Sequence, residues 1–243
     1  DYYNWMLGTC ALANSTAFGR VNTLKWLMYI AQEKGWIRVH PFVSFECMPE
    51  YKRRSFLSEE ELQRMIHLEL RYKRQRAMRD MFLFMCFTGL AYADLKAITY
   101  DNIHTDSNGG TWLMGNRIKT GVAYVVKLLP IAIELIERYR GVDEKKDSPE
   151  CVFPVGEYNT MFLSLKIIGK KCNCRAEVTP HIGRHTFAVL AILKGMPLET
   201  LQKVLGHKSI LSTQIYAELI NPKVGEDTDK ICEKIGHIYK LAM

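Results

Sequence analysis

The stretch that decides the fold is TPHIGRHTFAVLAILKGMPLETLQKVLGHKSILSTQIYAEL, residues 179–219. It opens on Thr179-Pro180, an N-cap residue followed by a proline at the first helical position, which predicts a helix start. Two further short helices follow, one closed by Gly206 and one over residues 209–219. Three short helices in succession, with no strand pattern between them, predict a helical C-terminal region.

The rest of the chain adds more helices and one small sheet. Ser58 and Glu61 form a capping box. It starts a helix that we expect to run into the Arg/Lys-rich residues 71–76, followed by a second helix over about 77–87. Two β-type runs flank the turn Lys119-Thr-Gly. The sequence therefore predicts a mainly α fold with a small antiparallel three-stranded sheet. The strands are expected near residues 101–105, 111–117 and 122–128. Further helices are expected from Pro130, over 157–171 and over 181–194, with a polar loop over 142–156.

We expect two domains, residues 1–51 and 52–243. The first part carries an amphipathic helix that begins near Asn14 and ends at Gly35. Lys52-Arg53-Arg54 is typical of a linker, so the boundary is expected near residue 52. Because the chain starts at Asp1 with an already amphipathic segment, we expect it to be a fragment of a longer protein.

Composition excludes several classes of protein. A hydrophobic content of 48% over 243 residues is that of a globular chain rather than a disordered one. The longest apolar run, residues 81–93, is too short to span a bilayer, and no signal peptide is evident. Seven scattered cysteines do not form a disulfide framework or a zinc motif, which favours reduced thiols in a cytoplasmic protein.

The net charge of +7 is unevenly distributed along the chain. Residues 51–80 hold nine basic against five acidic residues, and residues 165–208 hold eight against two. Two basic blocks separated by neutral sequence suit a surface that follows a phosphate backbone. The alternative is a solvated charged face, and charge alone does not separate the two interpretations.

His181, Arg184 and His185 occupy the first turn of the helix at 181–194 and share one face of it. A helix N-terminus favours anions, and an arginine can bind two phosphate oxygens at once. The pattern therefore predicts a phosphate pocket, with capping and packing roles for these residues as the alternative. The two histidines have the spacing of a zinc pair, but the glutamate that such an enzyme needs is missing.

The ordered set His-x-x-Arg-His, then Leu-Gly-His207, then Tyr216, resembles the C-terminal signature of the tyrosine recombinases, or phage-type integrases. Phe87-Thr-Gly-Leu-Ala-Tyr-Ala-Asp94-Leu is similar to the first motif of that family, and Lys119 matches its hairpin lysine. Residues 1–50 resemble the end of the helical core-binding domain. Several segments resemble integrases of conjugative and mobilisable transposons in particular.

The resemblance implies a catalytic role for each matching residue. Tyr216 would attack the scissile phosphate and form a 3′-phosphotyrosyl link. Arg184 would bind the non-bridging oxygens, and His207 would donate a hydrogen bond to the same phosphate. His181 would take the tyrosine proton or hold the phosphate, and Lys119 would protonate the leaving 5′-oxygen. Fixed cationic donors can supply the charge that phosphoryl transfer needs, so we expect no metal and no other cofactor.

Ala91 departs from the family pattern, which has an arginine there. Losing one such donor costs about 10²–10³ in rate, so another cation is needed if the enzyme is active. Arg79 is the leading candidate because helical spacing places it on the core-facing side; the alternative is that it pairs with a carboxylate or extends to solvent. Arg117 is the second candidate, because it shares a strand face with Lys119. Asp94 is expected to orient its neighbours.

The expected partner is double-stranded DNA. Proposed contacts to its backbone are basic residues of the linker and first catalytic helices: Lys52, Arg53, Arg54, Arg71, Lys73 and Arg74. An apolar stripe over residues 231–241 predicts either core packing or docking on a partner. In the resembled family such a tail often packs on a neighbouring protomer, which would suit a tetrameric synapse, and accessory DNA-bending proteins would be further partners.

The resemblance implies a site-specific recombinase that integrates or excises a mobile element. Two alternatives stay open. One is a type IB topoisomerase-like enzyme, which would share the tyrosine chemistry without needing partner sites. The other is a DNA-binding relative that has lost catalysis, as the alanine at position 91 suggests.

Overall fold

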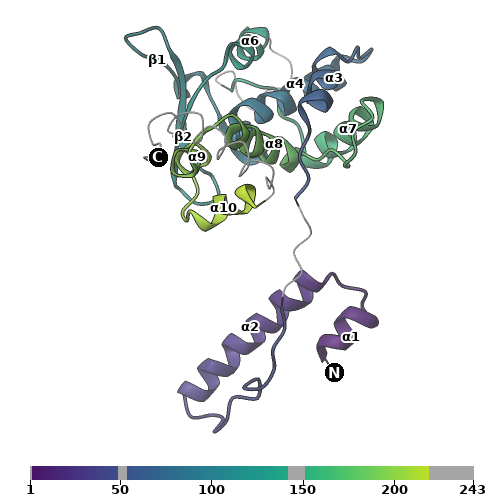
Figure 1. Cartoon of the computed structure of the whole chain (residues 1–243), viewed down its shortest axis with the longest axis vertical. Helices are drawn as coiled ribbons and strands as arrows, with labels where there is room; N and C mark the ends of the chain where they lie inside the picture. Colours follow the sequence, from purple (N-terminus) through teal and green to yellow (C-terminus); the bar gives the residue numbers. More distant parts are fainter. Residues whose placement is uncertain (1, 49–53, 142–150, 219–243) are drawn as a thin grey trace, which may run out of the picture. The chain divides into compact units, whose positions relative to one another are not determined.

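The computed structural model describes residues 2–48, 54–141 and 151–218. The chain divides into two compact units, residues 1–53 and residues 54–243. The sequence places the boundary between residues 51 and 52. Each unit has its own apolar core, so each is described by itself (Figure 1).

The first unit consists of helices α1 (Tyr2–Gly8) and α2 (Asn14–Glu33), followed by an irregular segment. Met6, Ala17 and Val21 form its buried centre, against which aromatic side chains of the irregular segment pack. Helix α2 begins after Ala13, without a side-chain cap. The interpretation of this unit as part of a core-binding domain stays a prediction.

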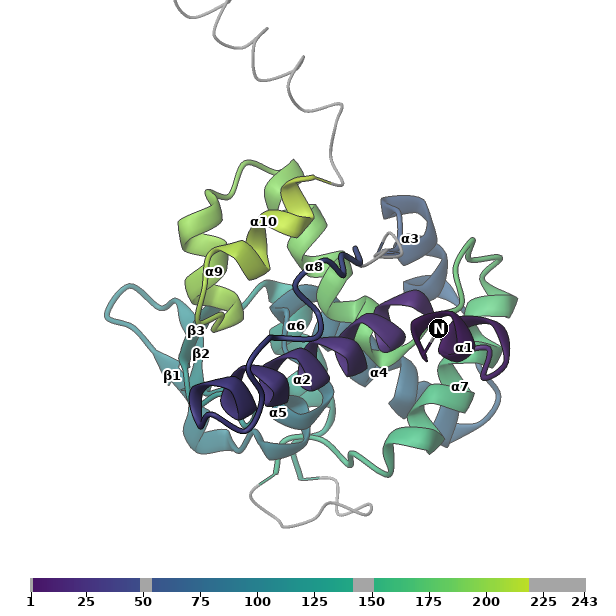
Figure 2. The same ribbon diagram turned by 90° about the horizontal axis from the view of Figure 1, so that it is seen from below.

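Helix α8 lies in the middle of the second unit and packs against α4 (Figure 1). Seen from below, the strands lie to one side of this pair and α7 and α3 to the other (Figure 2). The helices of the unit are α3 (Glu59–His67), α4 (Lys73–Thr88), α5 (Tyr92–Ala97), α6 (Pro130–Arg138), α7 (Tyr158–Lys171), α8 (Pro180–Leu193), α9 (Leu198–Leu205) and α10 (Leu211–Ala217), with a 3-10 turn, η1 (Tyr100–Asn102). None of the helices in the described ranges combines the length and the apolarity that crossing a bilayer requires.

The sheet is antiparallel with strand order β1 (Ile103–Thr105), β2 (Thr111–Asn116) and β3 (Ala123–Lys127). Leu113 pairs with Ile103 on one side and with Val126 on the other. The predicted three-stranded sheet is therefore confirmed. The turn between β2 and β3 carries Lys119, and helix α9 packs on β3.

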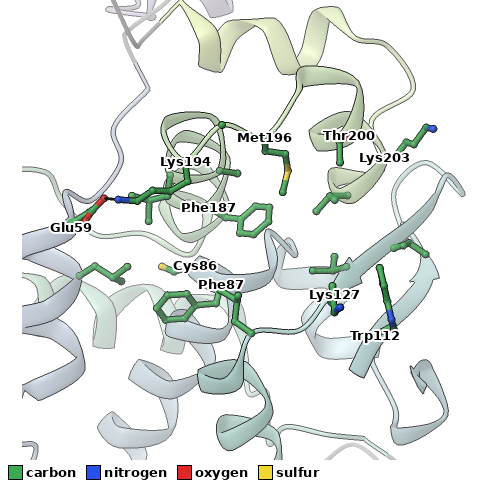
Figure 3. A pocket seen from close by; sticks show the side chains of 18 of the residues that line it. Glu59, Cys86, Phe87, Trp112, Lys127, Phe187, Lys194, Met196, Thr200 and Lys203 are labelled. Carbon is green, nitrogen blue, oxygen red and sulfur yellow. Dashed lines mark ion pairs between the residues drawn. The ribbon is translucent and has the colours of Figure 1, made fainter. Parts of the chain in front are cut away.

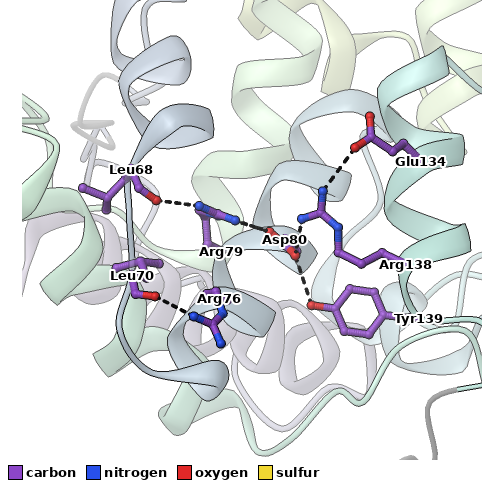
Figure 4. A network of polar contacts seen from close by, with 8 residues as sticks. All are labelled: Leu68, Leu70, Arg76, Arg79, Asp80, Glu134, Arg138 and Tyr139. Carbon is purple, nitrogen blue, oxygen red and sulfur yellow. Dashed lines mark hydrogen bonds and ion pairs between the residues drawn. The ribbon is translucent and has the colours of Figure 1, made fainter.

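The predicted long helix from Ser58 is wrong at its end. The Ser58–Glu61 capping box starts α3, but α3 stops at His67, and α4 begins at Lys73. The chain between them is held by two arginines of α4: Arg79 Nη1 donates to the Leu68 carbonyl at 2.6 Å and Arg76 Nη1 to that of Leu70 at 2.9 Å (Figure 4). Guanidinium donors thus satisfy carbonyls that a continuous helix would have bonded internally.

The predicted polar loop over residues 142–156 also needs correction. Residues 142–150 lie outside the described part of the chain, but the end of the segment is core. Val152 and Phe153 are buried, and the backbone of Cys151 forms an isolated antiparallel β-bridge with that of Thr99. Phe153 packs its ring against Phe84 and Tyr139. The apolar side chains of Val152 and Phe153 draw the end of this segment into the core, although the residues before them are mainly polar.

Candidate active site

Arg184 lies in the first turns of α8 and is 3% exposed. Its guanidinium donates to two backbone carbonyls, that of Gly89 at 2.6 Å and that of Leu205 at 2.7 Å. Gly89 ends α4 with a positive φ of 73°, and Leu205 is the last residue of α9. Two helix C-termini, which carry partial negative charge, therefore fix the arginine that the sequence places at the phosphate.

Tyr216 lies on α10 and is buried, with 1% exposure. Its ring belongs to an apolar cluster that also contains Val189 of α8 and Leu201 of α9. Its hydroxyl group is 2.9 Å from Nδ1 of His185. The packing of α10 on α8 therefore brings the predicted nucleophile, Tyr216, next to the His-Arg-His motif of α8.

Both remaining histidines of the motif border this pair. The His181 ring lies edge-on to the His185 ring at 4.3 Å between centroids. His207 lies just past α9, with its ring parallel to that of Tyr216 at 6.5 Å. Nδ1 of His207 is 2.9 Å from Oγ1 of Thr213, which fixes the orientation of the imidazole.

The electrostatic setting keeps these histidines neutral. Burial, reinforced by the neighbouring cations, lowers the pKa of His185 to about 3 and that of His207 to about 4. Burial also lowers the pKa of Arg184 to about 10, with Arg117 the next contributor. Burial raises the pKa of Tyr216, while the arginines at positions 184 and 54 act in the opposite direction. The arginines at positions 184, 117 and 54 thus give the site a positive potential that suits an anion.

Arg117 directly follows β2, and its guanidinium approaches the Leu205 carbonyl beside Arg184. Its Nη1 is 3.1 Å from Oδ2 of Asp94 and 3.5 Å from the Leu205 carbonyl that Arg184 also binds. The ion pair with Asp94 does not have hydrogen-bond geometry, and within the described part of the chain Nε of Arg117 has no hydrogen-bond partner. Arg117 thus has donor capacity left for a ligand. Lys119, two residues on, is exposed and close enough to lower the pKa of His181, to which burial contributes most.

The model described as the phage integrase family matches residues 55–221. The chain belongs to the phage integrase family. This is the family of tyrosine recombinases that the sequence motifs resemble.

Relatives in the family include tyrosine recombinase XerA of Saccharolobus solfataricus, 30% identical over 71% of this chain and 56% of that protein. Tyrosine recombinase XerD of Halalkalibacterium halodurans is 29% identical over 62% of this chain and 51% of that protein. The chain thus spans about half the length of these curated relatives.

Solved structures of integrase-family proteins share the fold. The XerH site-specific recombinase bound to its palindromic difH substrate matches 92% of this chain and 69% of that one, with a TM-score of 0.73 and 19% identity. The Tn1549 transposon integrase in complex with a circular intermediate DNA matches 89% and 79%, with a TM-score of 0.68 and 18% identity. The predicted fold of a recombinase catalytic domain is therefore confirmed.

The departure from the family pattern at Ala91 lies beside Arg184. Ala91 is the N-cap residue of α5, and the carbonyl that Arg184 binds belongs to Gly89, two residues earlier. An arginine at position 91 would therefore start next to Arg184. The guanidinium of Arg117, the residue directly after β2, approaches the same Leu205 carbonyl as Arg184.

Arg79 is not part of this cluster. Its Nε and Nη2 bind Oδ1 of Asp80 at 3.1 and 2.9 Å, and its Nη1 binds the carbonyl between α3 and α4 (Figure 4). Asp80 is also bound by Arg138 and Tyr139. The suggestion that Arg79 replaces the missing arginine is therefore corrected: it pairs with a buried carboxylate, the alternative open from the sequence, because that carboxylate needs a cation.

Arg54 has a different setting from the one predicted. The sequence proposes it as a contact to the DNA backbone, but its guanidinium lies 5.9 Å from the centre of the Tyr216 ring. It also contributes to the low pKa values of the three histidines, after burial. No sequence pattern signals this, because Arg54 and Tyr216 are more than 160 residues apart.

The other proposed DNA contacts are spread over α4 and its approach. Arg71 is exposed before α4, Lys73 begins it, and Arg74 donates to Thr160 of α7 at 3.1 Å. Lys52 and Arg53 lie outside the described residues. The structure does not bring Arg71, Lys73 or Arg74 to the Tyr216 cluster.

A cavity of about 890 Å³, lined by other residues than the Tyr216 cluster, lies between α3, α8, α9 and the sheet (Figure 3). Its walls are mainly apolar, with Phe87, Phe187 and Met196 among them, and the Glu59–Lys194 ion pair at 2.7 Å lies at one side. No residue of the predicted site lines it. Within the described residues, no group of three or more His, Cys, Asp or Glu side chains could hold a metal.

Proposed function

We propose that this chain cleaves and rejoins double-stranded DNA through a phosphotyrosine, with Tyr216 as the nucleophile. The observation that carries the proposal is the convergence of Arg184, Arg117 and three histidines around one buried tyrosine. Family membership supports the same chemistry. Phosphoryl transfer needs little more from a protein than position and positive charge, and this cluster supplies both.

In the proposed reaction, Oη of Tyr216 attacks the scissile phosphorus and the P–O5′ bond breaks. Arg184 donates to the non-bridging oxygens, where charge accumulates. His207, held by Thr213, donates to the same phosphate. Lys119 gives its proton to the departing 5′-oxygen, and His181 holds the phosphate or takes the tyrosine proton. Attack by that 5′-hydroxyl, or by one from another strand, reverses the step and reseals the DNA.

Arg117 replaces the arginine missing at Ala91 in this proposal. It approaches the same carbonyl oxygen as Arg184, and its Nε is a buried donor without a partner in the described chain. A phosphate oxygen would satisfy that donor. Arg117→Ala is expected to lower cleavage about 10²–10³-fold, the effect of one lost transition-state donor, while Arg117→Lys recovers part of it. An unchanged rate in Arg117→Ala would refute the role.

The test of the overall reaction is covalent trapping on a nicked suicide substrate, in which the 5′-hydroxyl fragment diffuses away. Wild-type chain is expected to form a protein–DNA adduct that Tyr216→Phe does not form. DNA binding by Tyr216→Phe, measured by mobility shift, should be unchanged. An adduct that persists in Tyr216→Phe would contradict the assignment of the nucleophile.

We further propose a role in integrating or excising a mobile element. Support comes from the family and from the structural similarity to a transposon integrase. A topoisomerase IB-like enzyme would relax a supercoiled plasmid with no second site, whereas a recombinase would join two sites, so the two assays run side by side distinguish them. A chain without catalysis would bind DNA and yield no adduct on any substrate.

Assembly of several copies on DNA is also proposed, with the apolar cavity as the docking site for residues 231–241 of another copy. The apolar stripe of that tail matches a cavity with mainly apolar walls. Deleting residues 223–243 is expected to leave binding to a single half-site intact and to abolish the synapse, measured by light scattering. A synapse that forms without the tail would refute this contact. The cytoplasmic location and accessory DNA-bending proteins stay predictions.

A further inference from the structure

The sequence places His185 in a predicted phosphate pocket and the family resemblance gives it no role of its own, yet its imidazole contacts the hydroxyl of the proposed nucleophile. Its Nδ1 is 2.9 Å from Oη of Tyr216, and both side chains are buried. His181, the residue that the resemblance suggests for the tyrosine proton, is exposed and meets the imidazole of His185 edge-on. Proximity to the reacting oxygen therefore favours His185.

The donors around the phenol favour one direction for this contact. A tyrosine hydroxyl has one proton to donate and can accept from other donors. Arg184 and Arg54 lie close enough to lower the pKa of the phenol, and guanidinium groups can only donate hydrogen bonds. With cationic donors on its other side, the phenol donates its proton toward Nδ1 of His185 when the imidazole is the neutral tautomer protonated at Nε2.

We propose that His185 accepts the proton of Tyr216 during attack on DNA. This inference rests on the proposed function. As the Oη–phosphorus bond forms, the Oη–H bond breaks and its proton goes to Nδ1, giving an imidazolium. The P–O5′ bond breaks at the same time, and the 5′-oxygen takes a proton from Lys119. On resealing, the imidazolium returns its proton to Oη.

The charges around His185 support a proton acceptor that works only with DNA present. In the free chain, burial and the nearby cations hold the pKa of His185 at about 3, so the imidazole is neutral and a poor base. A bound phosphate brings negative charge into the same cluster and offsets the field of Arg184, Arg54 and His181. Proton transfer therefore becomes easier when the substrate is in place.

The experiment measures single-turnover formation of the covalent adduct on a nicked half-site. His185→Ala is expected to slow cleavage about 10²–10⁴-fold, the usual contribution of a general base. His185→Gln, whose amide oxygen can accept a hydrogen bond but cannot take the proton, should be nearly as slow. His104→Ala, an exposed histidine on β1, is the matched control and should cleave at the wild-type rate.

Two chemical substitutions separate proton transfer from loss of packing. A fluorinated tyrosine at position 216 ionises at lower pH, so it should restore much of the rate in His185→Ala. A substrate with sulfur at the bridging 5′ position needs no proton on its leaving group. It should rescue Lys119→Ala and leave His185→Ala slow.

Several results would overturn the proposal: a wild-type rate in His185→Ala, full recovery in His185→Gln, or no rescue by fluorotyrosine in a variant that still folds and binds DNA. Rescue of His185→Ala by the sulfur substrate would place His185 on the leaving-group side and would also overturn it. Failure of the wild-type chain to form any adduct would instead remove the proposed function. The two failures are therefore distinguishable.

Discussion

Asp94 holds Arg117 through one carboxylate oxygen and the hairpin turn through the other. Oδ2 lies 3.1 Å from Nη1 of Arg117, and Oδ1 accepts the backbone N–H of Ile118 at 2.9 Å. Ile118 directly precedes Lys119, so one buried carboxylate positions two cations of the proposed site. A negative charge beside a phosphate would by itself weaken phosphate binding. Here the carboxylate of Asp94 instead orients Arg117 and the turn that carries Lys119.

Asp94 variants should therefore lose activity in a graded order. Asp94→Asn keeps an acceptor for the N–H of Ile118 and loses the charge that pairs with Arg117, whereas Asp94→Ala loses both. We expect cleavage to fall about 10-fold in the first and about 10²-fold or more in the second, within the effect of one displaced donor. Single-turnover cleavage checks this order. Equal rates in both variants would show that the turn does not depend on Asp94.

Gly206→Ala should disturb Arg117. Gly206 has φ +60°, and a Cβ there would lie 2.7 Å from Cγ of Arg117. Gly195→Ala is the matched control, because Gly195 also has positive φ but no heavy atom within 4 Å of its Cβ position. Both variants should lose about 1–2 kcal/mol of unfolding free energy to backbone strain. Only Gly206→Ala should also lose cleavage, measured on equal amounts of folded protein.

Asp80 should matter for stability and not for chemistry. It is buried and bound by Arg79, Arg138 and Tyr139 (Figure 4). Asp80→Ala leaves Arg79 without its carboxylate, and removing one partner of a buried pair costs about 3–5 kcal/mol. Urea unfolding measures the loss. Arg79→Ala should lose less unfolding free energy than Asp80→Ala and should cleave normally when folded. Slow cleavage by folded Arg79→Ala would show that Arg79 contributes to the active site.

Stability should fall as the pH drops below about 6.5. The pKa values of His185 and His207 in the folded chain are about 3 and 4, against the ordinary 6.5. Between these values the unfolded chain binds more protons, so each histidine removes up to about 1.4 kcal/mol per pH unit as pH decreases. Unfolding free energies at pH 7 and pH 5 test this. The double variant His185→Gln/His207→Gln should flatten the difference, and the exposed His104→Gln should not.

Arg71 and Lys73 should contribute to DNA affinity through phosphate contacts. Arg71→Gln and Lys73→Gln should each weaken binding uniformly across DNA sequences and reduce the slope of log affinity against log salt by about 1. Fluorescence anisotropy between 50 and 200 mM salt measures the slope. Lys166→Gln, on α7 and paired with Glu177, is the control for a basic residue outside the proposed surface. An unchanged slope in the first two variants would remove them from the interface.

Much of the fold follows from local signals. The Ser58–Glu61 capping box, the proline at the start of α8, the glycine after α9 and the alternation in β2 and β3 each act within a few residues. The break between α3 and α4 could not be predicted in the same way. It depends on Arg76 and Arg79, which reach back from the next helix to bind the carbonyls of residues 70 and 68.

The candidate site shows the same division. The motifs indicate Arg184, His207 and Tyr216 because those residue types recur at fixed spacing. The setting of Arg54 depends on the approach of two segments at opposite ends of the catalytic unit. Similarly, the choice between Arg79 and Arg117 could not be made from helical spacing, because Asp80 lies next to Arg79 and a buried carboxylate takes the nearest cation.

The place of Tyr216 in the apolar cluster of α8 and α9 has a consequence for the lifetime of DNA breaks. An aromatic ring that buries 150–250 Å² gains about 4–6 kcal/mol from that burial. Under the proposed mechanism, any packing that the ring gives up when Oη bonds to the phosphate is regained only when the strand is resealed. In the proposed reaction, burial of Tyr216 would therefore favour resealed DNA over the covalent intermediate and shorten the lifetime of the break.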